Sequence, residues 1–268
     1  MSKGFMWVCQ NNSNTDYARL SANLAQTLKK FNKHNSVCVL TDKNTKIDSP
    51  HIDVIKIMND DDSESHKIKW ANEYKIFYTS PFTHTIKLAA DMMWNTNTDW
   101  WWNYLCQHDM IFAINCYNYK NEIVENYSYR PFHKRNHLPN IYSDLTYFRK
   151  SHKSFEFGTI CKELTKHWEV VRDHALINCH DKYPSTDVVY ALAHRMMDPT
   201  QKDLVDYPWF KFVHNKRFIH DLGHVREYRK YLMPLKVKDR IVLGGHALTR
   251  PWHYVDKDTI EELDARIF

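Results

Sequence analysis

An aspartate directly follows a short apolar run in the middle of the chain. Residues Thr85–Ala90 read TIKLAA, and Asp91 comes next. The run predicts a buried strand, and open α/β sheets bind ligands just beyond the carboxyl ends of their strands. A carboxylate in that place can hold a divalent cation while leaving room for phosphate oxygens to complete its shell. The alternative interpretation is that Asp91 only caps a helix.

The hydrophobic pattern indicates the elements that would position Asp91. A strand, helix, strand opening favours a parallel sheet over an all-α or all-β fold. No repeat or linker divides the chain, so we expect one α/β domain over residues 1–268, with a central, mostly parallel, Rossmann-like sheet flanked by helices. The predicted strands are Gly4–Cys9, Ser36–Leu40, Asp53–Ile57, Thr85–Ala90, Met110–Ile114 and Asn140–Arg149. The predicted helices are Asp16–Asn32, Lys69–Thr79, Phe157–Asp173 and Thr186–Arg195, with Ser185 or Thr186 as a cap.

Composition narrows the function classes. Only 5 glycines occur, which leaves no room for a Gly-rich phosphate loop, whereas aromatic residues reach 14% and could stack on sugars or bases. The net charge of +5 is compatible with a polyanionic partner. The six cysteines show no paired spacing, and no apolar run approaches the ~18 residues of a membrane span. We therefore expect a soluble, cytoplasmic protein without a membrane partner.

The region around Asp91 resembles a known family of enzymes. Residues Trp70–Met92 read WANEYKIFYTSPFTHTIKLAADM. This stretch resembles the segment of GT-A-type glycosyltransferases, in particular glycogenin-like ones, in which a lysine-bearing helix precedes a strand that ends in Asp-x-Asp. The resemblance implies that Lys75 contacts the nucleotide and that Asp91 binds a metal. The first aspartate of the motif is absent, since Ala89 stands in its place.

A second match lies near the carboxyl end. Residues Gly244–Trp252 read GGHALTRPW, which resembles the family's histidine and G-x-x-K-P-W stretch. The resemblance implies that a histidine completes the metal shell, with His246 as the first candidate and His253 as the second. Arg250 and Trp252 would bind the donor, because the planar guanidinium can bind two diphosphate oxygens at once.

Weaker matches complete the expected donor site. Asn140–Asp144 resembles the family's N-S-G strand, with Asp144 where glycine is usual, and Ser185–Asp187 resembles a helix start that faces the donor sugar. The helix dipole would favour Asp187 there without any function. The resemblance thus implies catalytic roles for Asp187 and Asp91, and a Mn²⁺ or Mg²⁺ ion at Asp91 and His246. The donor-binding residues, for a nucleotide-diphosphate sugar that the family links to UDP, would be Tyr17, Asp42, Lys75, Ser143, Arg250 and Trp252.

The acceptor is predicted from a more distant likeness. Small size, basic charge and Asn/Lys-rich composition resemble glycosyltransferases of T-even-like bacteriophages, which modify 5-hydroxymethylcytosine in double-stranded DNA. A GT-A-type member would resemble the arabinosyl-adding class. Basic residues interleaved with aromatic ones could follow a phosphate backbone, namely Lys134, Arg135, Lys216 and Arg217.

Two alternatives remain open from the sequence. The chain could glycosylate a glycan or a protein, or it could be a non-catalytic nucleic-acid-binding protein with a decayed donor site, because the first aspartate of the motif is missing.

Overall fold

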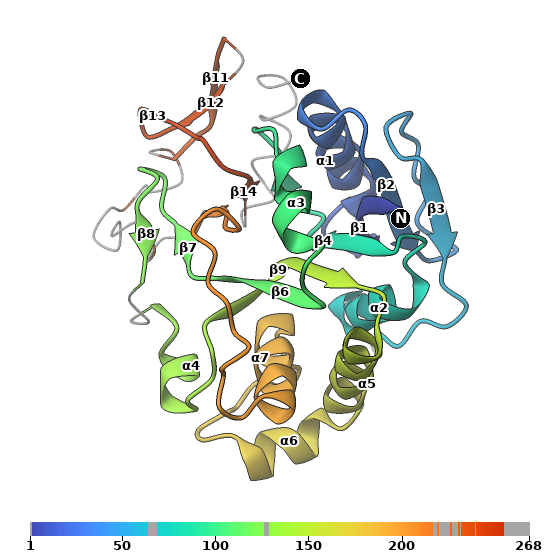
Figure 1. Ribbon diagram of the computed structural model, residues 1–268, viewed down its shortest axis with the longest axis vertical. Helices are drawn as coiled ribbons and strands as arrows, with labels where there is room; N and C mark the ends of the chain where they lie inside the picture. The colour runs from blue at the N-terminus through green and yellow to red at the C-terminus, as the bar shows by residue number, and fades with distance from the viewer. Residues whose placement is uncertain are drawn as a thin grey trace.

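The computed structural model describes residues 2–63, 69–125, 129–216, 219, 226, 230, 232–238 and 240–254. Its centre is a six-stranded sheet in the order β3-β2-β1-β4-β9-β6 (Figure 1). These strands are β1 (Lys3–Cys9), β2 (Ser36–Thr41), β3 (Val54–Ile57), β4 (His84–Leu88), β6 (Met110–Ile114) and β9 (Ile141–Arg149). The pairs β3/β2, β2/β1 and β1/β4 are parallel, whereas β4/β9 and β9/β6 are antiparallel. The prediction of a mostly parallel central sheet is confirmed.

Both faces of the sheet are buried at its inner strands β2, β1 and β4, as the apolar run of β1 requires. Phe5 and Trp7 point into one hydrophobic cluster, and Met6 between them points into the other. This alternation follows from the two-residue period of a strand. A strand with two covered faces reads as continuously apolar, which is the pattern of a parallel α/β sheet.

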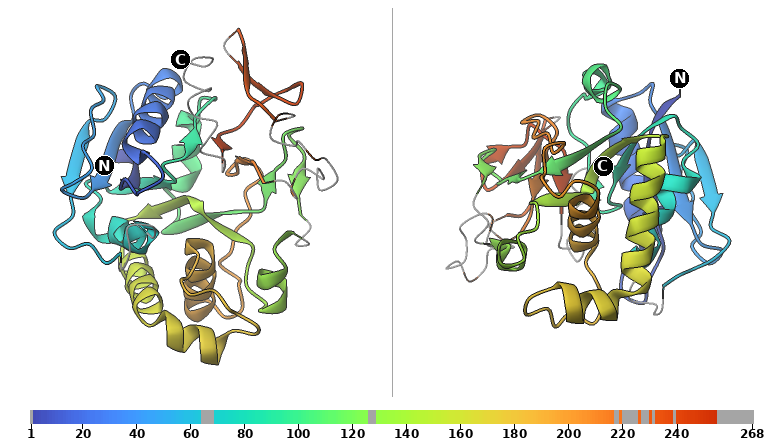
Figure 2. Two further views of the ribbon diagram at one scale, coloured as in Figure 1. Left: turned by 180° about the vertical axis from the view of Figure 1, so that it is seen from behind. Right: turned by 60° about the horizontal axis from the view of Figure 1, so that its bottom comes forward.

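Helices cover the two faces (Figures 1 and 2). On one side lie α1 (Tyr17–Phe31), the 3₁₀ helix η2 (Asp99–Trp101) and α3 (Trp102–Leu105). On the other side lie the 3₁₀ helix η1 (Lys69–Lys75), α2 (Ile76–Thr79), α5 (His152–Lys166) and α7 (Thr186–Met197), with α6 (Trp168–Ala175) and α4 (Pro131–Arg135) beyond them. Asp16 caps α1 by accepting a hydrogen bond from the backbone of Arg19, and Leu20, Leu24 and Leu28 form its buried stripe.

Two helix predictions need correction. The predicted helix Phe157–Asp173 is two helices, because the chain turns at His167, which ends α5 and begins α6. The turn buries Trp168, whose indole donates to the backbone of Asp181. The predicted helix Lys69–Thr79 is a 3₁₀ helix up to Lys75 and only then α-helical. The cap of α7 at Ser185 is confirmed.

Two smaller sheets complete the fold. The second sheet has the order β5-β14-β10-β7-β8, and the third sheet has the order β11-β12-β13. Their strands are β5 (Met92–Met93), β7 (Cys116–Tyr117), β8 (Ile123–Val124), β10 (Val213–His214), β11 (Leu235–Val237), β12 (Arg240–Leu243), β13 (His246–Ala247) and β14 (Trp252–His253). Within the described ranges, the structure contains no helix with the length and apolar character needed to cross a bilayer.

Candidate functional site

Asp91 lies where the central sheet meets the second sheet. Strand β4 ends at Leu88, and β5 of the second sheet begins at Met92, so Asp91 directly precedes that strand. No helix begins there, and the alternative role of Asp91 as a helix cap is therefore wrong. The side chain is largely buried. A carboxylate fixed between two sheets has little freedom to move, which suits a ligand of a bound ion.

Two histidines reach this position through strand pairing. His253 of β14 pairs with Met92 of β5, the residue after Asp91, and with His214 of the parallel strand β10. Because His214 and His253 are partners in register, their rings stack with centroids 4.7 Å apart and planes 4° apart. The Nε2 atom of His253 lies 3.2 Å from a carboxylate oxygen of Asp91.

A second carboxylate approaches from the central sheet. The backbone carbonyl of Asp144 accepts a hydrogen bond from the backbone N–H of Ala89, and its side-chain oxygen lies 3.2 Å from Nδ1 of His253. Burial alone would lower the pKa of His253, but Asp144 and Asp91 raise it to about 10. The two carboxylates therefore favour a proton on His253, and a cation bound there would displace that proton, because a ligating imidazole must be neutral.

This group of side chains could hold a metal ion. One ligand atom each from Asp144, His214 and His253 lies within 4.8 Å of the others. Two ligands at about 2.1 Å from a common ion lie no more than roughly 4.2 Å apart, so small side-chain adjustments would suffice. Carboxylates and imidazoles are ordinary ligands of divalent ions. The residues present therefore fit a divalent cation.

The group lies in a cleft of about 530 Å³, here called the donor cleft because residues that the sequence resemblance assigns to donor binding line it. The cleft contains six of the candidate site residues named from the sequence, namely Tyr17, Asp91, Ser143, Asp187, Lys216 and His253. It is also lined by Val8, Gln10, Asn12, Lys69, Trp70, Glu73, Ala89, Ala90, Asp144, Ser185, Thr186 and His214. A volume of this size is typical of small-molecule sites.

Asp187 is firmly fixed at the start of α7. One carboxylate oxygen accepts hydrogen bonds from the backbone N–H and the hydroxyl of Ser143, both at 2.8 Å. The other accepts from the guanidinium of Arg130 at 2.9 Å. Burial raises the pKa of Asp187, but Arg130, Lys216 and the Ser143 backbone outweigh it and bring the pKa down to about 2. Asp187 is therefore a positioned, ionised hydrogen-bond acceptor and a weak base.

His246 does not join Asp91. It lies exposed on β13, within the sheet β11-β12-β13, and its ring is 5.5 Å from that of Tyr119. His253, the second candidate, takes the place beside Asp91. His253 lies there because β14 pairs with β5 in the register that sets His253 opposite Met92. The local sequence motif does not specify this register.

Four of the six predicted donor-binding residues do not line the donor cleft, namely Lys75, Arg250, Trp252 and Asp42. Lys75 points to the preceding loop, where it bonds the backbone of Asp60 and pairs with Asp62 at 3.2 Å. Arg250 stacks its guanidinium on the ring of Tyr117 at 3.9 Å. Trp252 is buried in the core of the second sheet, where it positions its neighbour His253.

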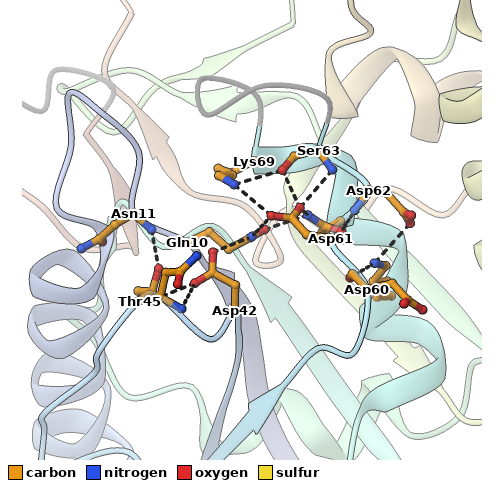
Figure 3. Close-up of polar contacts among 12 residues, drawn as sticks. Gln10, Asn11, Asp42, Thr45, Asp60, Asp61, Asp62, Ser63 and Lys69 are labelled. Carbon is orange, nitrogen blue, oxygen red and sulfur yellow. Dashed lines mark hydrogen bonds and ion pairs between the residues drawn. The ribbon is translucent and has the colours of Figure 1, made fainter.

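Asp42 also lies outside the donor cleft but is connected to it (Figure 3). Gln10, which lines the cleft, donates to Asp42 at 2.9 Å and to Asp61 at 3.2 Å. Asp61 in turn accepts a hydrogen bond from Lys69 at 2.9 Å. Although burial raises the pKa of Asp61, its hydrogen bonds with Ser63 and Lys69 lower it well below the ordinary value. Asp42 thus orients Gln10 at the end of β1.

The predicted nucleic-acid-binding residues are dispersed. Lys134 and Arg135 are exposed on α4, whereas Lys216 lies in the donor cleft close enough to lower the pKa of Asp187. Arg217 lies outside the described residues.

Among the residues of the donor cleft that sequence reasoning missed are His214 and Glu73. Glu73 pairs with the fully buried Lys87, which also donates to the backbone of Ser143 at 2.8 Å. Burial raises the pKa of Glu73, although Lys87 opposes the shift. The sequence did contain a signal for Glu73, namely Lys87 within a predicted buried strand. A buried ammonium almost always has a carboxylate partner, so a nearby acidic residue could have been expected.

A second cavity of about 480 Å³ adjoins the donor cleft, sharing Trp70, Glu73 and Thr186 with it. It lies between η1, α5, α6 and the start of α7. The hydroxyl of Tyr190, which lines it, is buried and makes no hydrogen bond among the described residues. The indole of Trp70 at its rim donates to the backbone of Pro184 at 2.8 Å.

Solved structures share this architecture. Mouse xyloside xylosyltransferase 1 in its apo form superposes with a TM-score of 0.52 at 9% identity, over 95% of this chain and 98% of that one. Galactosyltransferase LgtC, in complex with donor and acceptor sugar analogues, superposes with a TM-score of 0.54 at 11% identity, over 94% of this chain and 87% of that one. This chain has the GT-A glycosyltransferase fold. No family model and no curated protein sequence matches it.

Proposed function

We propose that this chain is a metal-dependent glycosyltransferase that binds a nucleotide-diphosphate sugar, specifically a UDP-sugar, in the donor cleft. The observation that carries the proposal is the convergence of Asp144, His214 and His253, with Asp91 in contact with His253, in a cleft of suitable volume. A Mn²⁺ or Mg²⁺ ion at this position would neutralise the charge that develops on the departing diphosphate.

Residues along the donor cleft fit the parts of such a donor. Lys216 places a positive charge in the cleft, where it would pair with the diphosphate. Gln10, directly after the carboxyl end of β1, and Tyr17, at the start of α1, would contact the nucleoside. Asp187 would accept hydrogen bonds from hydroxyls of the donor sugar. A pKa of about 2 makes it unsuited to removing a proton near neutral pH, so its part is to orient the sugar.

The experiment that tests the proposal incubates the chain with a panel of UDP-sugars and Mn²⁺ and measures hydrolysis as the release of UDP. We expect metal-dependent release that EDTA abolishes and that Asp91→Asn reduces strongly. Asp48→Asn, which changes an exposed aspartate, is the matched control. A chain that binds no UDP-sugar and releases no UDP from any member of the panel would exclude the enzyme and favour the non-catalytic alternative.

The acceptor expected from the sequence resemblance is 5-hydroxymethylcytosine in double-stranded DNA, with arabinose as the sugar. The exposed basic residues Lys134 and Arg135 on α4 support it, because phosphate contacts of this kind hold a duplex without reading its sequence. The target base would have to leave the stack to reach the cleft.

A carbohydrate acceptor is the second candidate, and the second cavity favours it. Its lining carries three carboxylates, of Asp62, Glu73 and Glu169, against the ammonium groups of Lys166 and Lys182. Such a balance does not attract a polyanion, whereas the buried hydroxyl of Tyr190 and the indole of Trp70 suit a neutral, hydroxyl-rich ligand. Because this cavity shares Trp70, Glu73 and Thr186 with the donor cleft, an acceptor in it would lie beside the donor sugar.

Mass spectrometry of products separates the two acceptors. Hydroxymethylated duplex DNA and a glycan panel are each incubated with UDP-sugars and Mn²⁺. Transfer to DNA should be lost in Lys134→Glu/Arg135→Glu and kept in Tyr190→Phe, and transfer to a glycan should show the reverse. Donor hydrolysis without acceptor should survive in both variants.

A further inference from the structure

The cation site contains a carboxylate from an unexpected strand. In the sequence Ala89-Ala90-Asp91, the position that would carry the first carboxylate has only a methyl group. Ala89 nevertheless lines the donor cleft, as do Asp91 and Asp144. The cleft therefore has an alanine where one carboxylate was expected and an aspartate on the neighbouring strand.

Ala89 and Asp144 are neighbours across the sheet. Strands β4 and β9 pair antiparallel with Leu88 opposite Leu145, and the next step along the ladder joins the N–H of Ala89 to the carbonyl of Asp144 at 3.1 Å. Side chains of directly opposite residues on one face start about 4.5–5.5 Å apart. A carboxylate at position 144 can therefore reach the space that one at position 89 would fill.

The ring of His253 lies between two carboxylates, and the side chains whose ligand atoms lie within 4.8 Å of one another are those of Asp144, His214 and His253. The two ring nitrogens of His253 each lie 3.2 Å from a carboxylate oxygen, one of Asp91 and the other of Asp144. His214 lies against the same ring through the pairing of β10 and β14. Two carboxylates from the central sheet region thus face two imidazoles from the second sheet.

We propose that Asp144 supplies the carboxylate that Ala89 lacks and that His214 adds a second imidazole, so that the site holds a first-row transition-metal ion in preference to Mg²⁺. Mg²⁺ takes oxygen ligands almost exclusively, whereas imidazole nitrogen is a good ligand for Mn²⁺ and a better one for Co²⁺. The inference refines the cation site of the proposed function, but its test needs no glycosyl transfer.

The test measures metal binding by the full chain. Free Mn²⁺ is followed by electron paramagnetic resonance, and Co²⁺ binding by its visible spectrum. We expect affinity in the order Co²⁺, Mn²⁺, Mg²⁺. Asp144→Asn should weaken Mn²⁺ binding at least about tenfold, whereas the matched control Asp48→Asn should not change it. His214→Gln should weaken Co²⁺ binding and alter its spectrum, because one nitrogen ligand is lost.

The decisive variant moves the carboxylate back to β4. Ala89→Asp/Asp144→Asn should recover Mn²⁺ affinity to within about threefold of the unchanged chain. If Asp144→Asn does not fold, Asp144→Glu keeps the charge but displaces it by one methylene, and the same loss of affinity is expected. Unchanged Mn²⁺ affinity in the folded Asp144 variant, failure of the double variant to recover it, or equal affinity for Mg²⁺ would overturn the inference. Intact metal binding without any UDP-sugar hydrolysis would instead contradict the proposed function and leave this inference standing.

Discussion

His214 and His253 stack face to face because they are register partners on two parallel strands, β10 and β14. Neither strand is longer than two residues. Their pairing nevertheless decides the chemistry of the site, because it sets both imidazoles beside the point where the chain leaves the central sheet at Asp91. The second sheet therefore supports both histidines of the proposed metal site.

Removing the Asp91 carboxylate should abolish turnover without unfolding the chain. We expect Asp91→Asn to lower the rate of UDP-sugar hydrolysis by at least about 100-fold, because the proposed ion loses a ligand. Thermal unfolding should change little, since the variant also removes a charge that is costly to bury. Hydrolysis at the unchanged rate would show that Asp91 does not hold the ion.

Lys216 should act on the donor and not on DNA. Since Lys216 lies in the donor cleft, Lys216→Met should weaken UDP binding about tenfold, or ~1.4 kcal/mol, measured by calorimetry. Lys134→Met, on the exposed face of α4, is the control and should leave UDP affinity unchanged. Equal UDP affinities in the two variants would remove Lys216 from the donor site.

Arg130 should be important for stability because it neutralises the buried Asp187. Arg130→Met leaves that carboxylate without its cation, and we expect a loss of about 3–5 kcal/mol in the free energy of unfolding by urea. Arg135→Met, at an exposed position of the neighbouring α4, should stay within about 0.5 kcal/mol. Adding Asp187→Asn to Arg130→Met should recover part of the loss, and no recovery would indicate that packing is the cause.

His133 should make the fold sensitive to mild acid. Burial and the neighbouring Arg130, which lies 2.7 Å away, lower the pKa of His133 from 6.5 to about 3. Between pH 6.5 and pH 3, His133 therefore binds a proton in the unfolded chain but not in the folded chain. The free energy of unfolding keeps its full value above pH 6.5 and falls as the pH drops toward 3. At pH 5 the loss is ~2 kcal/mol.

The variant His133→Gln isolates this effect. Glutamine keeps a hydrogen-bond acceptor for Arg130 and cannot titrate, so its unfolding free energy should fall less between pH 7 and pH 5 than that of the unchanged chain. Identical pH dependence in urea unfolding would assign the acid sensitivity to other groups.

The local features of the fold could be predicted from the sequence. Strand β1 is specified by its continuous apolar run, in which Phe5, Met6 and Trp7 alternate between the two faces, and α1 is specified by the helical spacing of Leu20 and Leu24. Both patterns repeat over a few residues, so a short stretch of sequence contains them. A carboxylate after a buried strand likewise predicted Asp91 at a ligand-binding edge, since strand direction fixes which end of the sheet it occupies.

Only the tertiary structure decided which side chains meet Asp91. Whether His246 or His253 lies there depends on the register of β14 against β5, and a shift of one residue would turn His253 to the opposite face. The position of Asp144 beside Ala89 and the turning of Lys75 toward Asp62 are likewise set by pairing between distant segments. Periodicity encodes local geometry, but register between distant strands comes from the packing of the whole core.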